Sequence, residues 1–253
     1  MDFAGGNVVH ITSGVAGAVA TVLVCSRNSN PPISEPSNFL LTFLGQSLLW
    51  VGWFAFNAAA HFKANGRSSL ALINTQITAG AGAMSWVVVD WVSSRRPKVS
   101  SVISGAIAGL VAATPSCGWI DQTGAFFIGA LAGPWCYLWA RLKHRLGYDD
   151  SLDAYGVHGT GGILGGLLTG FFASPSAYDS AGSNGVAYYP GVFYAAGSRD
   201  QARQLGVQAY GCLVTAAYSG VASFVLLQLV DRTIGLREVD EGEAAMDHRD
   251  LSR

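Results

Sequence analysis

Seven apolar stretches follow one another along the chain, and short polar segments separate them. A helix needs about 20 apolar residues to cross a bilayer. The pattern therefore predicts seven transmembrane helices, at residues 3–25, 39–60, 69–91, 99–114, 123–139, 155–173 and 204–230. The proline-rich polar segment 27–36 must lie outside the hydrocarbon, where its backbone can pair with water. Segment 174–203, rich in Gly, Ser, Ala and Tyr, is predicted to be a plain connector.

Composition places these helices in a membrane. Half of the residues are hydrophobic and 12% are charged, against about 25% charged in soluble domains. The predicted fold class is therefore all-α, a polytopic membrane helical bundle, and the 32 glycines suit close helix packing. The net charge of −1 argues against a nucleic-acid partner. The four cysteines share no metal-ligand spacing, so neither a metal nor a cofactor is expected.

Lys and Arg near the helix ends predict the orientation, because such residues are retained on the cytoplasmic side. One side of the predicted bundle collects eleven of them, Arg27, Arg95, Arg96, Lys98, Arg141, Lys143, Arg145, Arg232, Arg237, Arg249 and Arg253. The other side has four, Lys63, Arg67, Arg199 and Arg203. The C-terminus is therefore predicted to be cytoplasmic and Met1 outside. The chain then divides into a transmembrane domain, residues 1–234, and an acidic cytoplasmic tail, residues 235–253.

An acid and a histidine recur at one spacing in two of the predicted helices. Asp2 precedes His10 by eight residues in DFAGGNVVH, and Asp150 precedes His158 by eight in DSLDAYGVH. A polar side chain at membrane depth is costly unless it faces a partner or a cavity. Because the first helix descends and the sixth ascends, the two segments run antiparallel, as in an inverted-topology repeat with its site near the midplane. Asp2 is then expected at the outer mouth and Asp150 at the inner mouth.

Two other interpretations of the histidines are open at this point. They are unrelated residues, each bonded to a neighbouring carbonyl group, or they are the axial ligands of a haem. Gly162, Gly166 and Gly170 leave one face of the sixth helix as nearly bare backbone, which suits close packing and also a narrow pore. No Ser-His-Asp ordering, phosphate loop or metal quartet can be placed on one face, so an enzyme is not predicted.

Five motifs resemble those of the ammonium transporter (Amt/Mep/Rh) family, in the family's order and over nearly the whole chain. They begin at Asp2, Gly52, Ser104, Tyr155 and Gly235, and read DFAGGNVVH, GWFAFN, SGAIAGLVAATPSCG, YGVHGTGG and GLR. The resemblance implies a homotrimer in the plasma membrane, with eleven helices and one hydrophobic pore for ammonium or ammonia in each subunit. This chain would supply about seven of the eleven helices, which leaves the inverted repeat incomplete.

The resemblance also implies roles for individual residues. His10 and His158 would be the paired pore imidazoles, bonded to each other, and Phe56 would be one of the stacked rings at the outer entrance. Trp53 would line the pore nearby, and Asp2 would shape the vestibule that recruits the ammonium ion. The residues with structural roles near the pore would be Asn57, Asp150 and Gly162.

Two features depart from the family's pattern. The family has about four further helices before this point, which carry the partner aromatic of the outer gate and half of the pore wall. Met1 stands directly against Asp2, which favours a truncated or degenerate sequence over a designed short form. After Asn57 the chain reads AAAH, where the family has small residues including a serine that helps to hold the ion. Ala60 has no hydroxyl, and His61 either substitutes for it or is simply solvated.

Two hypotheses of different class follow. In the first, the chain transports ammonium: an imidazole can take a proton, so ammonium loses its proton, moves as ammonia and is recharged, whereas potassium is rejected. In the second, the chain is a non-transporting fragment that acts as an ammonium sensor or as a partner subunit of a trimer. At the inner mouth, a salt network is predicted among Asp150, Asp153, Arg141, Lys143 and Arg145.

Overall fold

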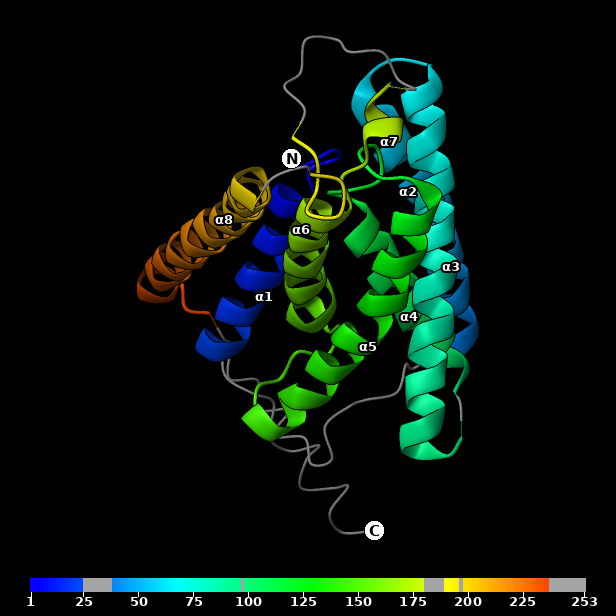
Figure 1. The fold of residues 1–253 in the computed structure, drawn as a ribbon. Helices are drawn as coiled ribbons and strands as arrows, with labels where there is room; N and C mark the ends of the chain where they lie inside the picture. The colour runs from blue at the N-terminus through cyan, green and yellow to red at the C-terminus, as the bar shows by residue number, and fades with distance from the viewer. Residues whose placement is uncertain (25–37, 97, 180–188, 196–197, 237–253) are drawn as a thin grey trace.

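The computed structural model describes residues 1–24, 38–96, 98–179, 189–195 and 198–236, which form an all-helical bundle (Figure 1). Its α-helices are α1 (Thr12–Leu23), α2 (Phe39–Ala58), α3 (Gly66–Ser94), α4 (Val99–Ala113), α5 (Gln122–Leu146), α6 (Thr160–Phe172), α7 (Pro175–Asp179) and α8 (Ser198–Thr233). Two π-helical segments, η1 (Gly6–Ile11) and η3 (Ala154–Gly159), run directly into α1 and α6, and a 3-10 turn, η2 (Ala59–His61), ends α2. An isolated β-bridge joins Ile120 to Ala173.

All seven predicted helices are present, but several ends differ for physical reasons. Helix α3 begins at Gly66 because the Asn65 side chain accepts the N–H groups of Arg67 and Ser68. Helix α5 continues past residue 139 to Leu146, since its last turns are basic and suit an aqueous surface. The prediction of a plain connector over residues 174–203 was wrong in part, because α7 and the start of α8 lie within it.

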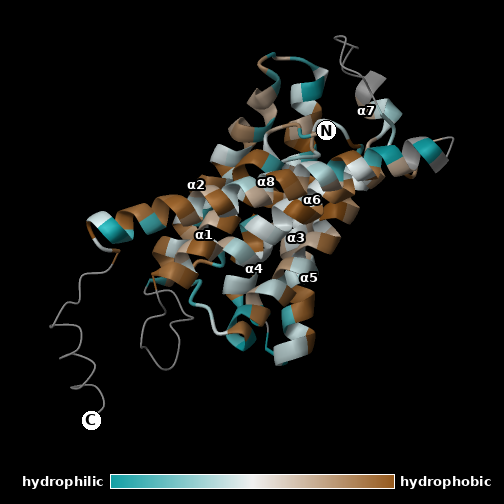
Figure 2. Cartoon of the chain, turned by 90° about the vertical axis from the view of Figure 1, so that its left-hand side faces the viewer, coloured by the Kyte–Doolittle hydropathy of each residue, from teal (hydrophilic) through white to brown (hydrophobic). Residues whose placement is uncertain are grey.

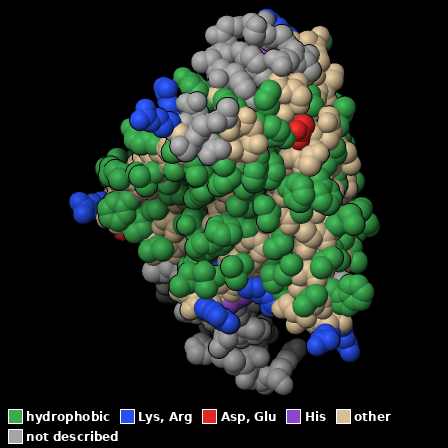
Figure 3. Space-filling view, viewed as in Figure 1, with side chains coloured by type: hydrophobic (Ala, Val, Ile, Leu, Met, Phe, Trp, Pro, Cys, Tyr) green, Lys and Arg blue, Asp and Glu red, His purple; other side chains and the backbone are tan. Residues whose placement is uncertain are grey.

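The surface of the bundle is that of a membrane protein. Within the described residues, four helical stretches are long and apolar enough to cross a bilayer, namely Gly6–Leu23, Phe39–His61, Gly66–Ser94 and Ala202–Thr233, and Val99–Ala113 is a shorter apolar helix. Hydrophobic residues run along the helices, with hydrophilic residues towards their ends (Figure 2). Figure 3 shows hydrophobic side chains covering the middle of one face, with most Lys and Arg above and below them. The prediction of a multi-pass membrane bundle is confirmed.

The core lies where α3 crosses α4 and α5. At this crossing the backbones approach so closely that a Cβ atom on Gly109 or Gly129 would lie 2.3 Å from the carbonyl oxygen of Thr78. Close approach of this kind depends on small residues. The crossing fixes α4, at whose end Thr114 is fully buried.

The two histidine segments lie side by side and antiparallel, as the sequence predicts. In Figure 1, α1 leads away from the N-terminus while α6 runs back towards that end. Helix α1 packs against η3, and helix α6 packs against η1. Each helix therefore contacts the π-helical segment that precedes the other, which brings His10 of η1 and His158 of η3 to the crossing point.

Candidate functional site

The repeated acids cap the two π-helical segments. The carboxylate of Asp2 accepts the N–H groups of Gly6 and Asn7, at 2.6 and 3.1 Å. The carboxylate of Asp150 accepts those of Ala154 and Tyr155, both at 2.9 Å. The spacing of eight residues therefore joins a cap at the start of each segment to a histidine near its end.

The backbone turns in the same way before each segment. The residue that precedes η1 is Gly5, with φ of 82°, and the residue that precedes η3 is Asp153, with φ of 52°. Positive φ is rare outside glycine, asparagine and aspartate.

Burial raises the pKa of the Asp2 carboxyl group above its usual value, and the hydrogen bonds from the N–H groups of Asn7 and Gly6 oppose that shift.

We expect Asp150→Ala to destabilise the chain by about 2 kcal/mol, because two N–H groups at the start of η3 lose a charged acceptor. The free energy of unfolding in detergent micelles measures this loss. Asp150→Asn keeps one acceptor oxygen, so it should lose roughly half as much. Equal stability of the wild-type and Asp150→Ala chains would contradict the capping role.

The imidazole rings of His10 and His158 meet at the crossing of the two segments. Their Nδ1 atoms are 3.4 Å apart, and their ring centroids are 5.4 Å apart at 48°. Trp53 stacks against both rings, at 5.1 Å from His10 and 6.4 Å from His158. Phe56 lies further along α2, with its ring centroid 6.3 Å from that of His10. The structure thus brings four of the predicted site residues together.

Thr114 settles which nitrogen of His10 carries a proton. Its hydroxyl donates to the carbonyl oxygen of Leu110 at 2.9 Å, and it accepts from Trp53 Nε1 at 3.0 Å. His10 Nε2 lies 3.0 Å from the same oxygen. Since the single hydroxyl proton is already donated, His10 Nε2 must donate as well. The Nδ1 atom of neutral His10 is then an acceptor, so His158 Nδ1 donates to it and His158 Nε2 is left with a lone pair.

A hydrophobic cavity of about 480 Å³ lies beside His10. Its walls are Val9, His10, Gly45, Leu48, Leu49, Gly52, Trp53 and Phe56, which come from η1 and α2. His10 itself is only 4% exposed. An apolar cavity with an imidazole in its wall suits a neutral molecule that forms hydrogen bonds better than it suits a bare cation.

The remaining predicted residues lie around this centre. Asn57 is fully buried and donates to Thr75 Oγ1 at 2.9 Å. Gly162 faces His10, and a Cβ atom on Gly162 would lie 3.1 Å from the Cβ atom of His10. The ring of His61 stacks on that of Phe3, which is not one of the predicted site residues, with the ring centroids 6.3 Å apart. Two cationic residues, Arg67 and Lys63, lie near enough to His61 to act on it electrostatically.

The haem interpretation fails on geometry. Two imidazoles that share one iron must lie on opposite sides of it, with each nitrogen about 2 Å from the metal. Here the facing nitrogens are 3.4 Å apart, and Trp53 stacks against both rings. No iron or porphyrin fits between them.

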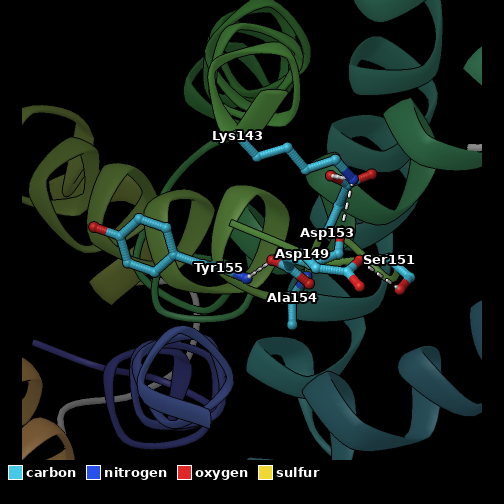
Figure 4. A network of polar contacts seen from close by, with 7 residues as sticks. Lys143, Asp149, Ser151, Asp153, Ala154 and Tyr155 are labelled. Carbon is cyan, nitrogen blue, oxygen red and sulfur yellow. Dashed lines mark hydrogen bonds and ion pairs between the residues drawn. The ribbon is translucent and has the colours of Figure 1, made fainter. Parts of the chain in front are cut away.

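The predicted salt network is present in part. Lys143 Nζ lies 2.6 Å from Asp153 Oδ1 and donates to the carbonyl oxygen of Asp150 at 2.7 Å (Figure 4). Burial raises the pKa of Asp153, and the ammonium group of Lys143 opposes that shift. The side-chain carboxylate of Asp150 caps η3, so only its backbone belongs to the network with Lys143.

Comparison with known proteins shows which family this chain resembles. The model of the Ammonium Transporter Family matches residues 1–251. The ammonium transporter of Bacillus subtilis (strain 168) is 39% identical over 246 residues, which are 96% of this chain and 57% of that protein. The crystal structure of Saccharomyces cerevisiae Mep2 matches with a TM-score of 0.84 and 31% identity, over 94% of this chain and 53% of that chain. A solved structure named Sensor Amt Protein matches with a TM-score of 0.81 and 27% identity, over 96% and 58%. This chain therefore spans about half the length of these relatives.

Proposed function

This chain belongs to the ammonium transporter family, and from that premise we propose that it conducts ammonium or ammonia across the membrane past His10 and His158. One observation carries the proposal: the two Nδ1 atoms lie 3.4 Å apart, and His10 lines a hydrophobic cavity. Membership of this family also agrees with the prediction that the chain is not an enzyme.

The geometry supports a mechanism in which the substrate crosses the apolar region without its charge. An ammonium ion entering the cavity would lose its hydration without gaining a counter-charge, which is costly. The hydrogen bonds to Thr114 leave His158 Nε2 as the free acceptor. We propose that this nitrogen takes the proton, that ammonia then passes the rings, and that the proton returns to ammonia on the far side, which leaves both imidazoles neutral again. Potassium carries no proton to give up, so it is rejected.

The other site residues support this passage. Phe56 is 42% exposed and forms the ring at the outer entrance, while Trp53 holds both imidazoles by stacking. Asp2 shapes the outer vestibule by fixing the start of η1, and Asp150 does the same for η3 at the inner mouth. Asn57 and Gly162 keep α2 and α6 in place beside the imidazoles.

Assembly and location are part of the same proposal. We propose a homotrimer in the plasma membrane with the C-terminus in the cytoplasm, residues 1–234 as the transmembrane domain and residues 235–253 as the acidic tail. Residues 237–253 lie outside the described part of the chain.

A second function is favoured by the open side of the cavity. All eight of its lining residues come from η1 and α2, and the chain spans about half the length of its relatives. A pore needs walls on every side, so transport by this chain requires further helices to complete the cavity, such as those of an associated subunit. Without them the chain would be an ammonium sensor or a partner subunit of a trimer, and one of the matched structures is named a sensor protein.

Growth on low ammonium by cells that lack their own ammonium transporters separates the two functions. We expect this chain to restore growth and the double variant His10→Ala, His158→Ala to abolish it. Gly80→Ala serves as the control, because a Cβ atom at Gly80 would meet nothing within 4 Å and Gly80 lies outside the lining of the cavity. Failure of the original chain, with membrane insertion confirmed, would contradict transport and support the sensor or partner function.

A further inference from the structure

A second cavity lies away from His10 and His158, at the end of the bundle where α3 and α5 end and α4 begins. Its volume is about 200 Å³, and its lining is polar. The charged residues of the lining are Asp90, Lys98, Arg141, Lys143 and Asp153, together with His144. None of them belongs to the lining of the cavity beside His10, so the proposed transport path makes no use of this pocket.

Both carboxylates in the pocket already have partners. Asp153 pairs with Lys143 at 2.6 Å. Asp90, only 5% exposed, accepts from Ser101 at 2.6 Å and from the Tyr137 hydroxyl at 3.4 Å. Both carboxylates are therefore already engaged by protein groups and are not available to pair with a cationic ligand.

The positive groups and the hydroxyls outnumber these acids. Three cationic side chains, those of Lys98, Arg141 and Lys143, face two carboxylates, which leaves one net positive charge before His144 is counted. Arg141 donates from Nε and Nη2 to the Tyr137 hydroxyl at 3.1 and 2.9 Å, which fixes the guanidinium at the wall. The remaining lining includes hydroxyl groups of Ser94, Ser100, Ser101, Ser104 and Ser151. Those of Ser94 and Ser101 donate to oxygens of Asp90, and that of Ser151 donates to Asp149, so a phosphate would compete for them. Hydroxyl, ammonium and guanidinium groups are the donors that bind a phosphate group.

The start of α4 adds to the positive electrostatic potential of this pocket. Ser100 and Ser101 lie in the first turn of this 15-residue helix and also line the pocket. No side chain in the described part of the chain caps that end of the helix. The N–H group of Ser101 donates to the carbonyl oxygen of Lys98 at 3.1 Å, and the positive end of the helix dipole favours an anion there.

We propose that this pocket binds a compact oxyanion of the phosphate class, either inorganic phosphate or the phosphate of a lipid headgroup. The size allows it, because 200 Å³ is about seven times the share of one water molecule in the liquid, enough for a phosphate group with several water molecules. The polar lining is a poor match for an apolar ligand.

Binding of an anion in the pocket is linked to His158 through Lys143. Figure 4 shows the Lys143 side chain extending from α5 towards Asp153, in the turn that leads into η3. The same ammonium group holds the carbonyl oxygen of Asp150, whose carboxylate caps the segment that carries His158. An anion in the pocket competes with Asp153 for Lys143, and so it weakens the contacts by which Lys143 holds the turn before η3.

Binding can be tested without any transport, on the purified full chain in nanodiscs. In one arm, inorganic phosphate is titrated into phosphatidylcholine nanodiscs at constant ionic strength and followed by its ³¹P linewidth. In the other arm, without free phosphate, native mass spectrometry counts lipids retained from mixed phosphatidylglycerol and phosphatidylcholine nanodiscs. Arg141→Gln removes a lining cation, and Arg145→Gln removes an exposed cation one turn further along α5 that does not line the pocket. Lys98→Gln is a second lining variant, in case Arg141→Gln does not fold.

We expect saturable binding in at least one arm, weakened about tenfold by Arg141→Gln or Lys98→Gln and unchanged by Arg145→Gln. Saturation in the first arm identifies free phosphate, and selective retention of phosphatidylglycerol in the second identifies a lipid headgroup. No saturable binding in either arm would overturn the proposal. So would equal weakening by Arg141→Gln and Arg145→Gln, because it would show only the general attraction of a basic surface.

Discussion

Replacing Gly14 with alanine is expected to stop the two histidine segments from crossing and to cost the chain most of its folded stability. A Cβ atom at this position would lie 2.2 Å from the backbone nitrogen of Gly159 and 2.3 Å from its Cα atom. Backbone cannot rotate away as a side chain can, so α1 and η3 would have to separate. Overpacking in a core usually costs about 1–3 kcal/mol, and a clash between two backbones should exceed about 4 kcal/mol.

The yield of monodisperse protein in detergent and the free energy of unfolding measure this effect. Gly80→Ala is the matched control, since a Cβ atom there meets nothing within 4 Å and alanine favours a helix. Gly162→Ala should fall between the two, because its nearest neighbours, the Cβ atom of His10 and Cγ1 of Ile11, are 3.1 Å away. A Gly14→Ala chain as stable as Gly80→Ala would show that the segments do not cross as closely as described.

The order of helices and the antiparallel histidine segments followed from the sequence because both depend on local signals. A stretch of about 20 apolar residues predicts a span wherever it occurs, and an odd or even count of spans gives the direction of each. The helix ends were less predictable. Helix α5 extends beyond its apolar stretch because Lys143, His144 and Arg145 suit the last turn of a helix that leaves the membrane.

The meaning of the acid-to-histidine spacing was predicted only in part. The repeated spacing of eight positions from acid to histidine suggested one acid at each mouth, and the structure shows the local reason for the spacing. Each acid accepts the N–H groups four and five residues ahead, where a π-helical segment starts. Whether a helix begins as π or α depends on the residue of positive φ before it and on packing against the other segment. Neither is visible in apolar periodicity.

Thr114 was missed as a site residue, although it lies within one of the family motifs. It is separated by 104 residues from His10 and by 61 from Trp53, so no local pattern joins the three. The one available signal was a hydroxyl residue directly before Pro115, at the end of an apolar run. Such a residue is common at helix ends, and only the fold shows which donors it meets.

Thr114→Val is the second substitution from which we expect a large effect. Valine has nearly the shape of threonine but accepts no hydrogen bond, so Trp53 Nε1 and His10 Nε2 both lose their acceptor at a fully buried position. Each orphaned donor costs about 1–3 kcal/mol, and the free energy of unfolding should fall by about 2–6 kcal/mol in total. Thr114→Ser keeps the hydroxyl and should lose much less.

The same substitution should change which histidine donates. In the wild-type chain the hydroxyl of Thr114 holds the proton of His10 on Nε2, which makes His158 Nδ1 the donor between the rings. Without that hydroxyl, His10 gains by moving its proton to Nδ1, and His158 then becomes the acceptor. Imidazole ¹⁵N chemical shifts in labelled protein report both tautomers directly. Unchanged shifts in Thr114→Val, beside unchanged shifts in Thr114→Ser, would show that the valine variant loses only packing and that Thr114 does not set the direction of the hydrogen bond.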